Sequence, residues 1–143
     1  MKSKMLNETG EKTWALIFET DDEVKSGLIE FAKANQLGGA HFSAIGGFRY
    51  VQLGYFDWQK KDYVPIVVDD QVEVLSLIGD LALQQGEPAL HAHVVVGTAD
   101  GTTRGGHLLK AYVRPTLEVI LSESPRHLRR QFDESSGLAL IKI

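Results

Sequence analysis

The segment from Gly86 to Leu109 constrains the fold most, because its pattern predicts a β-hairpin with polar chemistry on one face. It contains three of the five histidines, His91, His93 and His107, and a turn-forming Asp-Gly pair lies between the second and the third. Successive side chains of a strand point to opposite faces, so His91 and His93 share one face. That face can present two imidazoles to one metal ion.

The register of this hairpin decides whether His107 joins the pair. A two-residue turn at the Asp-Gly pair would place His107 opposite Val94, on the wrong face. A three-residue loop, Ala99-Asp100-Gly101 with a left-handed glycine, would place it opposite His93, and a bulge at Gly105-Gly106 would also correct the face. Directly opposed residues have Cβ atoms about 4.5–5.5 Å apart, so three imidazoles could then converge on one ion.

Length and composition restrict the remaining possibilities. A chain of 143 residues is expected to form a single domain over residues 1–143, with a polar and flexible lead-in at 1–12. The formal charge of −4 gives no general attraction to DNA or to acidic membranes, so nucleic-acid binding would need a local basic patch. Because there is no cysteine, a metal site must use imidazole and oxygen ligands. No apolar run is long enough for a membrane span or a signal peptide, which predicts a cytoplasmic protein.

One main helix is predicted near the N-terminus. A strand is expected over 13–19, and the capping-box pattern at Thr20–Glu23 introduces apolar residues at helical spacing, which predicts a helix over 21–36. Late in the chain, Ser124-Pro125 resembles a helix start, and Leu128 and Phe132 are four residues apart, which predicts a short helix.

The rest of the chain is predicted to be strands. Gly, Asp and Lys clusters separate the strand-like segments, which lie at 40–48, 49–58, 62–70, 72–83, 111–123 and 137–143. Pro65 cannot donate to a ladder, so its strand is expected at an edge or at a bulge. This order does not give the alternation of strands and helices that a parallel sheet requires. We therefore expect an α+β fold with a largely antiparallel, barrel-like or sandwiched sheet.

Three segments carry a resemblance to a known family: GEPALHAHVVVGTADGTTRGGHLL, AIGGFRYVQLGYFDW upstream and LEVIL downstream. Together they resemble the PPC domain, the family conserved in plants and prokaryotes and also known as DUF296. The resemblance implies an α+β domain of this length that assembles as a homotrimer. Plant members join this domain to AT-hooks that bind DNA, but this chain has no such motif. The fold is also similar to that of acetolactate decarboxylase, where an H-x-H pair and a later histidine hold zinc, and only His91, His93 and His107 match that pattern.

A metal ion held by these histidines would keep one coordination position free for a ligand. Three neutral imidazoles with a free fourth position suit zinc and other late first-row divalent ions. The same histidines could instead face solvent or a trimer interface and only form hydrogen bonds. Glu87 and Glu118 are candidate acid or base residues, and Arg104 is a candidate for holding a carboxylate, although a solvated surface charge is the more ordinary interpretation of each.

One basic cluster keeps DNA as an alternative partner. It consists of Arg126, His127, Arg129 and Arg130, and it could be an exposed helix face or a phosphate site. His41 precedes an apolar strand and is expected to be structural. The histidine register, together with the homotrimer that the family resemblance implies, therefore favours a trimer in which each subunit binds a divalent metal and a small anionic or carbonyl-containing ligand. The alternatives are a DNA-binding regulator and a trimeric scaffold without chemistry.

Overall fold

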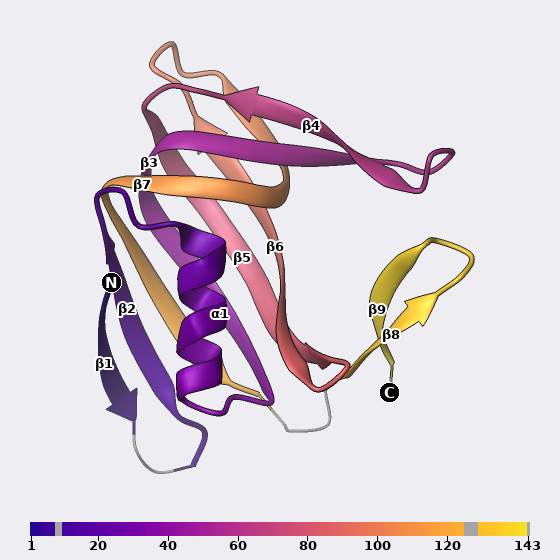
Figure 1. The fold of residues 1–143 in the computed structure, drawn as a ribbon. Helices are drawn as coiled ribbons and strands as arrows, with labels where there is room; N and C mark the ends of the chain where they lie inside the picture. Colours follow the sequence, from indigo (N-terminus) through magenta and orange to yellow (C-terminus); the bar gives the residue numbers. More distant parts are fainter. Residues whose placement is uncertain (8–9, 125–128, 143) are drawn as a thin grey trace.

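A computed structural model describes residues 1–7, 10–124 and 129–142 of the chain. The described part is mostly strand, with one helix that lies against the sheet (Figure 1). The elements in chain order are β1 (Lys2–Asn7), β2 (Thr13–Glu19), α1 (Val24–Ala34), β3 (Gly39–Asp57), β4 (Asp62–Val68), β5 (Val72–Gln84), β6 (Glu87–Gly97), β7 (Thr103–Glu123), β8 (Arg129–Asp133) and β9 (Leu138–Lys142). The predicted α+β class with a largely antiparallel, barrel-like sheet is confirmed.

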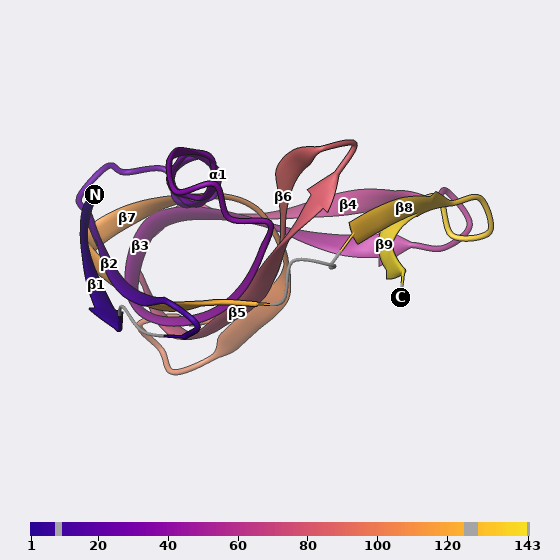
Figure 2. The same cartoon turned by 90° about the horizontal axis from the view of Figure 1, so that it is seen from below.

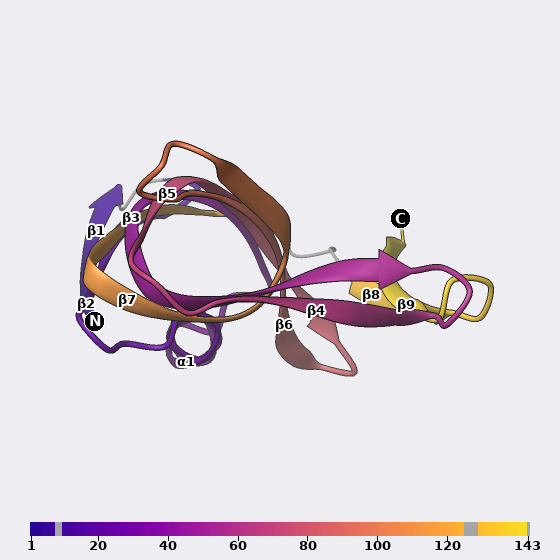
Figure 3. The ribbon, with the colours of Figure 1, turned by 90° about the horizontal axis from the view of Figure 1, so that it is seen from above.

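Four strands close into a ring at the centre of the molecule (Figures 2 and 3). β3 pairs with β5 and β7, and β6 closes the ring by pairing with β5 on one side and β7 on the other. β2 and then β1 extend the sheet beyond β7. Among the described strands, only β5 and β8 pair in parallel. The ring is therefore an uneven barrel built from antiparallel neighbours.

The two longest strands bend so that each takes part in more than one pairing. β7 pairs with β6 over its first residues and with β2 over its last. β3 has a register shift around Gly46, where a Cβ atom would lie 2.3 Å from the carbonyl oxygen of Thr116. Only glycine allows β3 and β7 to approach this closely. The strands predicted separately at 40–48 and 49–58 are one continuous strand, β3, and the strand predicted at 111–123 is the continuation of the hairpin strand in β7.

The helix α1 packs its apolar face against β6 and β7. It begins later than predicted, with Glu23 as the N-cap: the Glu23 carboxylate accepts hydrogen bonds from the backbone N–H groups of Lys25 and Ser26. Asp21 has a left-handed φ of 72°, which is incompatible with the predicted helical start at this residue. The buried face consists of Val24, Leu28, Phe31 and Ala32.

The core fills the inside of the ring and the layer beneath the helix. On β6 the even-numbered residues from Ala92 to Val96 are buried and face inward, whereas His93 and Val95 are exposed and face outward. The same alternation on the neighbouring strands supplies most of the largest fully buried side chains, which include Leu16, Phe18, Phe48, Leu53, Leu77, Leu81, Leu108, Leu117 and Leu121, and the helix adds Leu28. His91 and His93 therefore lie on the outer surface of the ring.

Two hairpins project from the ring on the same side (Figures 2 and 3). One is formed by the end of β3 with β4, and β4 is an edge strand, as the position of Pro65 predicts. The other is formed by β8 and β9. The hairpins touch near their tips, where the Lys61 ammonium group donates to the carbonyl oxygen of Glu134 at 2.7 Å. They bound the outer surface of β6 that carries the histidines.

Two predictions about the ends of the chain need correction. The expected flexible lead-in contains β1, which pairs with β2 in an antiparallel ladder. The expected short helix after Ser124 is wrong for residues 129–133, which form β8, and Phe132 is 69% exposed there. Its spacing from Leu128 therefore does not mark a buried face, while residues 125–128 lie outside the described part. No helix in the described part of the chain is long and apolar enough to span a bilayer.

Candidate metal centre

The hairpin of β6 and β7 has the register that brings the histidines together. His93 lies directly opposite His107, and the ladder continues without a shift to the end of β6. At the loop, the Thr98 N–H donates to the carbonyl oxygen of Thr102, and the Gly101 N–H donates to the carbonyl oxygen of Thr98, both at 2.9 Å. Gly101 has a left-handed φ of 81°. The predicted three-residue loop is confirmed, and no bulge at the later glycine pair is needed.

The side chain of Asp100 fixes this loop. Its carboxylate accepts hydrogen bonds from the hydroxyl groups of Thr98 and Thr102 and from the backbone N–H of Thr102. These bonds, the one from the Thr98 hydroxyl above all, lower the pKa of Asp100 to about 2. The loop that sets the histidine register is therefore held by a carboxylate that stays ionised at any physiological pH.

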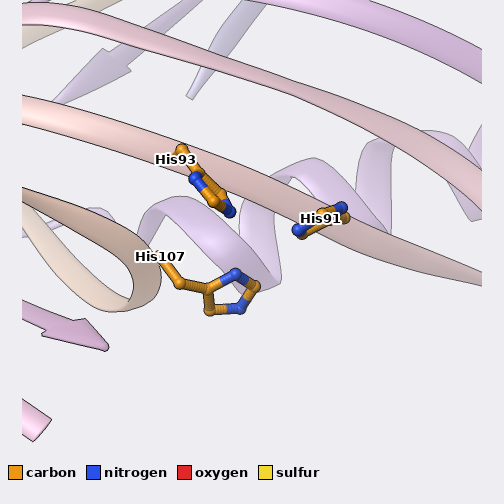
Figure 4. A group of neighbouring side chains, drawn as sticks. All are labelled: His91, His93 and His107. Carbon is orange, nitrogen blue, oxygen red and sulfur yellow. The ribbon is translucent and has the colours of Figure 1, made fainter. Parts of the chain in front are cut away.

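The three imidazoles of His91, His93 and His107 lie next to one another on the outer face of the hairpin (Figure 4). One ring nitrogen from each can be chosen so that all three lie within 4.8 Å of one another. The ring centroids are 5.1 Å apart for His91 and His93, 5.2 Å for His91 and His107, and 5.5 Å for His93 and His107. Metal–nitrogen bonds of about 2.0–2.1 Å would need only small adjustments of the side chains.

Burial keeps two of these imidazoles neutral. It is the main cause that lowers the pKa of His107 to about 4, and the neighbouring positive charges act in the same direction. Burial also lowers the pKa of His91, and the Arg130 guanidinium contributes. The Nδ1 atom of His107 is buried and has no hydrogen-bond partner in the described part of the chain. A buried nitrogen lacking a partner and held neutral by its surroundings fits a metal ligand.

Residues from both projecting hairpins surround this cluster. Tyr63 of β4 stacks on the His107 ring, with centroids 4.4 Å apart. Asp80 of β5 is the direct cross-strand partner of His91, and it forms an ion pair with Arg130 of β8. The histidines, an acid–base pair and an aromatic ring thus form one polar group outside the barrel.

A known family has this architecture. A model of the Plants and Prokaryotes Conserved (PCC) domain, also abbreviated PPC, matches residues 5–125. The chain belongs to this family. The three histidines lie within the matched residues, whereas β8 and β9 lie beyond them.

Solved structures of related proteins share the whole PCC fold. A metal-containing protein from Archaeoglobus fulgidus is 35% identical, with a TM-score of 0.86 and complete coverage of both chains. A PPC protein from Pyrococcus horikoshii is 29% identical, with a TM-score of 0.87 over 99% of this chain and 95% of its own. A candidate DNA-binding protein from Ralstonia eutropha is 25% identical, with a TM-score of 0.85 over 91% and 90% of the two chains.

Two more distant comparisons place the PCC domain in other contexts. Two bifunctional GlmU proteins of Synechococcus strains are 31% and 30% identical over 85% and 92% of this chain, which spans only about a fifth of their length. Acetolactate decarboxylase from Bacillus subtilis shares the fold at 15% identity, with a TM-score of 0.57 over 86% of this chain and 57% of its own. The predicted similarity to that fold is confirmed at the level of architecture.

Within this PCC domain, the three residues predicted to assist a metal lie away from the histidines. Glu87 is four residues before His91, about 13 Å along the strand, and forms an ion pair with Lys33. Glu118 shares the outer face with His93, but it is three strands away, about 14 Å along the sheet. Arg104 lies opposite Val96 on the inward-facing side of the ladder, so it points away from His93 and His107.

The PCC domain instead brings three other polar residues to the histidines, Tyr63, Asp80 and Arg130. Tyr63 and Arg130 come from strands that are distant in the sequence, so no local motif identifies them, whereas Asp80 lies on β5, the strand directly before β6. A partial signal exists for Asp80, a lone acid within an apolar strand segment. The remaining histidine of the described part, His41, donates to or accepts from the Ser124 hydroxyl at 3.1 Å and lies outside the cluster.

Proposed function

We propose that this PCC domain uses His91, His93 and His107 to hold a divalent metal ion, most favourably zinc, at which it binds or transforms a small anionic or carbonyl-containing ligand. The observation that carries the proposal is the convergence of three ligand nitrogens within 4.8 Å around a buried, unpartnered Nδ1 atom. The metal-containing relative from Archaeoglobus fulgidus, which this chain matches over its full length, supports it.

The donor set determines which metal and which chemistry are favoured. Three nitrogen ligands without a thiolate suit zinc and its first-row neighbours, and leave a tetrahedral position for a ligand. Bound there, the ion would polarise a carbonyl oxygen or lower the pKa of a bound water. The chain's own contribution is to hold His107 by stacking on Tyr63 and to keep two of the imidazoles, those of His91 and His107, in the neutral form that binds metal.

Metal analysis of protein purified without a histidine tag tests this proposal. We expect close to one zinc ion per chain in the wild type after reconstitution and dialysis, and a large loss in H93A. The matched control is H41A, which removes an exposed histidine of the same sheet face but leaves the three ligands in place. Less than about 0.2 metal per chain in the wild type, or an equal loss in H41A, would contradict the site.

We also propose that this domain assembles as a homotrimer, the form that the family resemblance implies, and that the outer sheet face beside His93 is its interface. Ile78 lies between His93 and Ser43 in one cross-strand row, and Ile120 continues that row on β7. This face exposes five large apolar side chains by 41% to 60%, namely Ile45, Leu75, Ile78, Val95 and Ile120. A contiguous apolar patch of this kind is typical of a protein interface.

Light scattering coupled to size-exclusion chromatography tests this assembly. The wild type should have the mass of three chains, and Ile78→Lys should reduce it to one chain because a charge would be buried at the interface. Ile66→Lys on the projecting β4 strand is the matched control, since its side chain is exposed outside this face and the mass should stay unchanged. A wild-type protein with the mass of one chain would contradict the proposed trimer.

DNA binding is a second candidate function, favoured by the description of the Ralstonia eutropha relative. The structure offers it little support, because Arg130 of the predicted basic cluster is 6% exposed and paired with Asp80, and Arg126 and His127 lie outside the described residues. A DNA-binding protein should retard duplex DNA in a gel at low salt, with affinity that falls steeply as salt rises. No retardation at 50 mM salt would exclude this function.

A further inference from the structure

We infer that the cavity between the β8–β9 hairpin and the histidines is the subsite for a short-chain carboxylate, and that Arg130 binds its carboxylate group. This inference extends the proposed metal function, because it names the class of ligand and the residue that recognises it. It assigns the β8–β9 hairpin, which lies beyond the residues that match the family, a role in ligand selection.

Arg130 is a buried cation, and one of its N–H groups has no hydrogen-bond acceptor among the described residues. Its side chain is 6% exposed; one terminal nitrogen donates to the Asp80 carboxylate, and the other to the carbonyl oxygen of Ala139 at 3.3 Å. Its Nε–H group is buried and has no acceptor among the described residues. Leaving such a donor unpaired is unfavourable, so a buried guanidinium normally uses all of its N–H groups. A bound acceptor would remove this cost.

The cavity beside Arg130 also borders the metal ligands. Its volume is about 140 Å³, and His91, His107 and Tyr63 line it together with Arg130. A ligand held by the guanidinium therefore lies next to two of the three imidazoles that would bind the metal. Arginine is the side chain best suited to a planar carboxylate, because its N–H groups match the two oxygens.

The rest of the cavity lining is largely apolar, and it determines the part of the ligand beyond the carboxylate. Leu90 of β6 lies there, and Leu138, Ala139 and Leu140 come from β9. At about 30 Å³ per water molecule, the cavity holds roughly four to five waters, which corresponds to a ligand of about five or six non-hydrogen atoms. Acids of three or four carbons fit this size. Their hydrocarbon part can lie against the apolar lining, whereas a phosphate ion would place polar oxygens there.

A purely structural role of Arg130 makes a different prediction. If the ion pair with Asp80 served only to attach the hairpin to β5, removal of either partner would have the same effect. If Arg130 binds a carboxylate, Asp80→Asn removes a competing negative charge and releases one donor, so carboxylate binding should stay equal or become tighter. Arg130→Gln should weaken it. The two variants therefore separate attachment from recognition.

The experiment is calorimetric titration of propionate, lactate and pyruvate, with inorganic phosphate as the competing anion, into zinc-loaded and metal-free protein. For the wild type, we expect binding of at least one of the carboxylates, and weaker binding of phosphate. R130Q should lose at least tenfold in affinity, whereas D80N should keep or improve it. R104Q is the matched control, because that arginine lies on the other face of β7, and its affinity should equal that of the wild type.

Three results would overturn the inference: no carboxylate binding by the wild type in either form, an unchanged affinity in R130Q, or an equal loss in D80N and R130Q. Thermal melts establish that each variant is folded, and if R130Q is not, R130K takes its place. R130K keeps the charge but loses the planar fork, and the same tenfold loss is expected. Metal content is measured separately, so carboxylate binding by metal-free protein with no zinc uptake would refute the proposed metal site while supporting the role of Arg130.

Discussion

Acidification should weaken zinc binding by this protein much less than it would weaken zinc binding by three histidines with ordinary pKa values. Protons compete with the metal for each imidazole, so the loss of affinity depends on the pKa of each ligand in the metal-free fold. Burial lowers the pKa of His107 from its usual 6.5 to about 4. Because a lowered pKa means weaker proton binding, His107 should remain available to the metal well below neutral pH.

The magnitude follows from the fraction of protonated imidazole. Between pH 7.5 and 5.5, a histidine with a pKa of 6.5 loses about a factor of ten in availability, so three independent histidines would cost about a thousandfold in affinity. For His107 with a pKa of about 4, the same change costs only a few per cent. The total loss should therefore be at most about a hundredfold, and smaller still because the pKa of His91 is also lowered.

Competition titrations against a zinc chelator of known affinity at pH 7.5, 6.5 and 5.5 measure this loss. Tyr63 covers the His107 ring, so Tyr63→Ala should raise the pKa of His107 towards 6.5. Acidification from pH 7.5 to 5.5 should then reduce the zinc affinity of this variant by up to about a further tenfold. Tyr55→Ala, which removes a 68% exposed tyrosine of the same hairpin, should behave like the wild type. A thousandfold loss in the wild type, or no difference between the two tyrosine variants, would refute the reasoning.

Three further predictions concern stability. Metal-free protein should lose stability as the pH falls from 6.5 towards 4, because the unfolded chain binds a proton at His107 more strongly than the folded chain does. Chemical denaturation at several pH values should show that the free energy of unfolding falls by at most about 3 kcal/mol, and by less because the ring is partly exposed. Leu28→Ala should lower the free energy of unfolding by about 2–5 kcal/mol in urea titrations, since this helix side chain is fully buried. Gly101→Ala should cost about 1–2 kcal/mol because of its left-handed backbone, while the zinc stoichiometry stays at the wild-type value.

The hairpin could be predicted from the sequence because neighbouring residues determine its alternation and its turn. Strand alternation places His91 and His93 on one face, and the turn residues allow only a few registers. The register that unites them with His107 is confirmed. Local patterns are less reliable where tertiary contacts decide. The helix α1 begins at Val24, after its N-cap Glu23, because Asp21 adopts a left-handed conformation and its N–H donates to the carbonyl oxygen of Val113 on β7.

The surroundings of the histidines could not be predicted in the same way. Asp80 and Arg130 are fifty residues apart and meet only because β8 adds to the edge of β5. The sequence pattern of that segment favours a helix, and as a helix it would have placed Arg130 in an exposed basic cluster. Pairing between β5 and β8 instead buries the guanidinium beside a carboxylate. Contacts between distant strands therefore determine which charges reach the histidines.

The two halves of the site come from different parts of the chain, and this has a consequence for specificity. The proposed metal ligands belong to a hairpin inside the residues that match the family, whereas Arg130 and most of the apolar lining of the cavity belong to the β8–β9 hairpin beyond them. A change in β8–β9 can therefore alter the ligand without disturbing the triad. If the inferred carboxylate subsite is correct, replacing Leu140 with a larger side chain should shift binding towards shorter acids while the zinc affinity remains constant. An equal change in the two affinities would show that the metal and ligand sites are not separable.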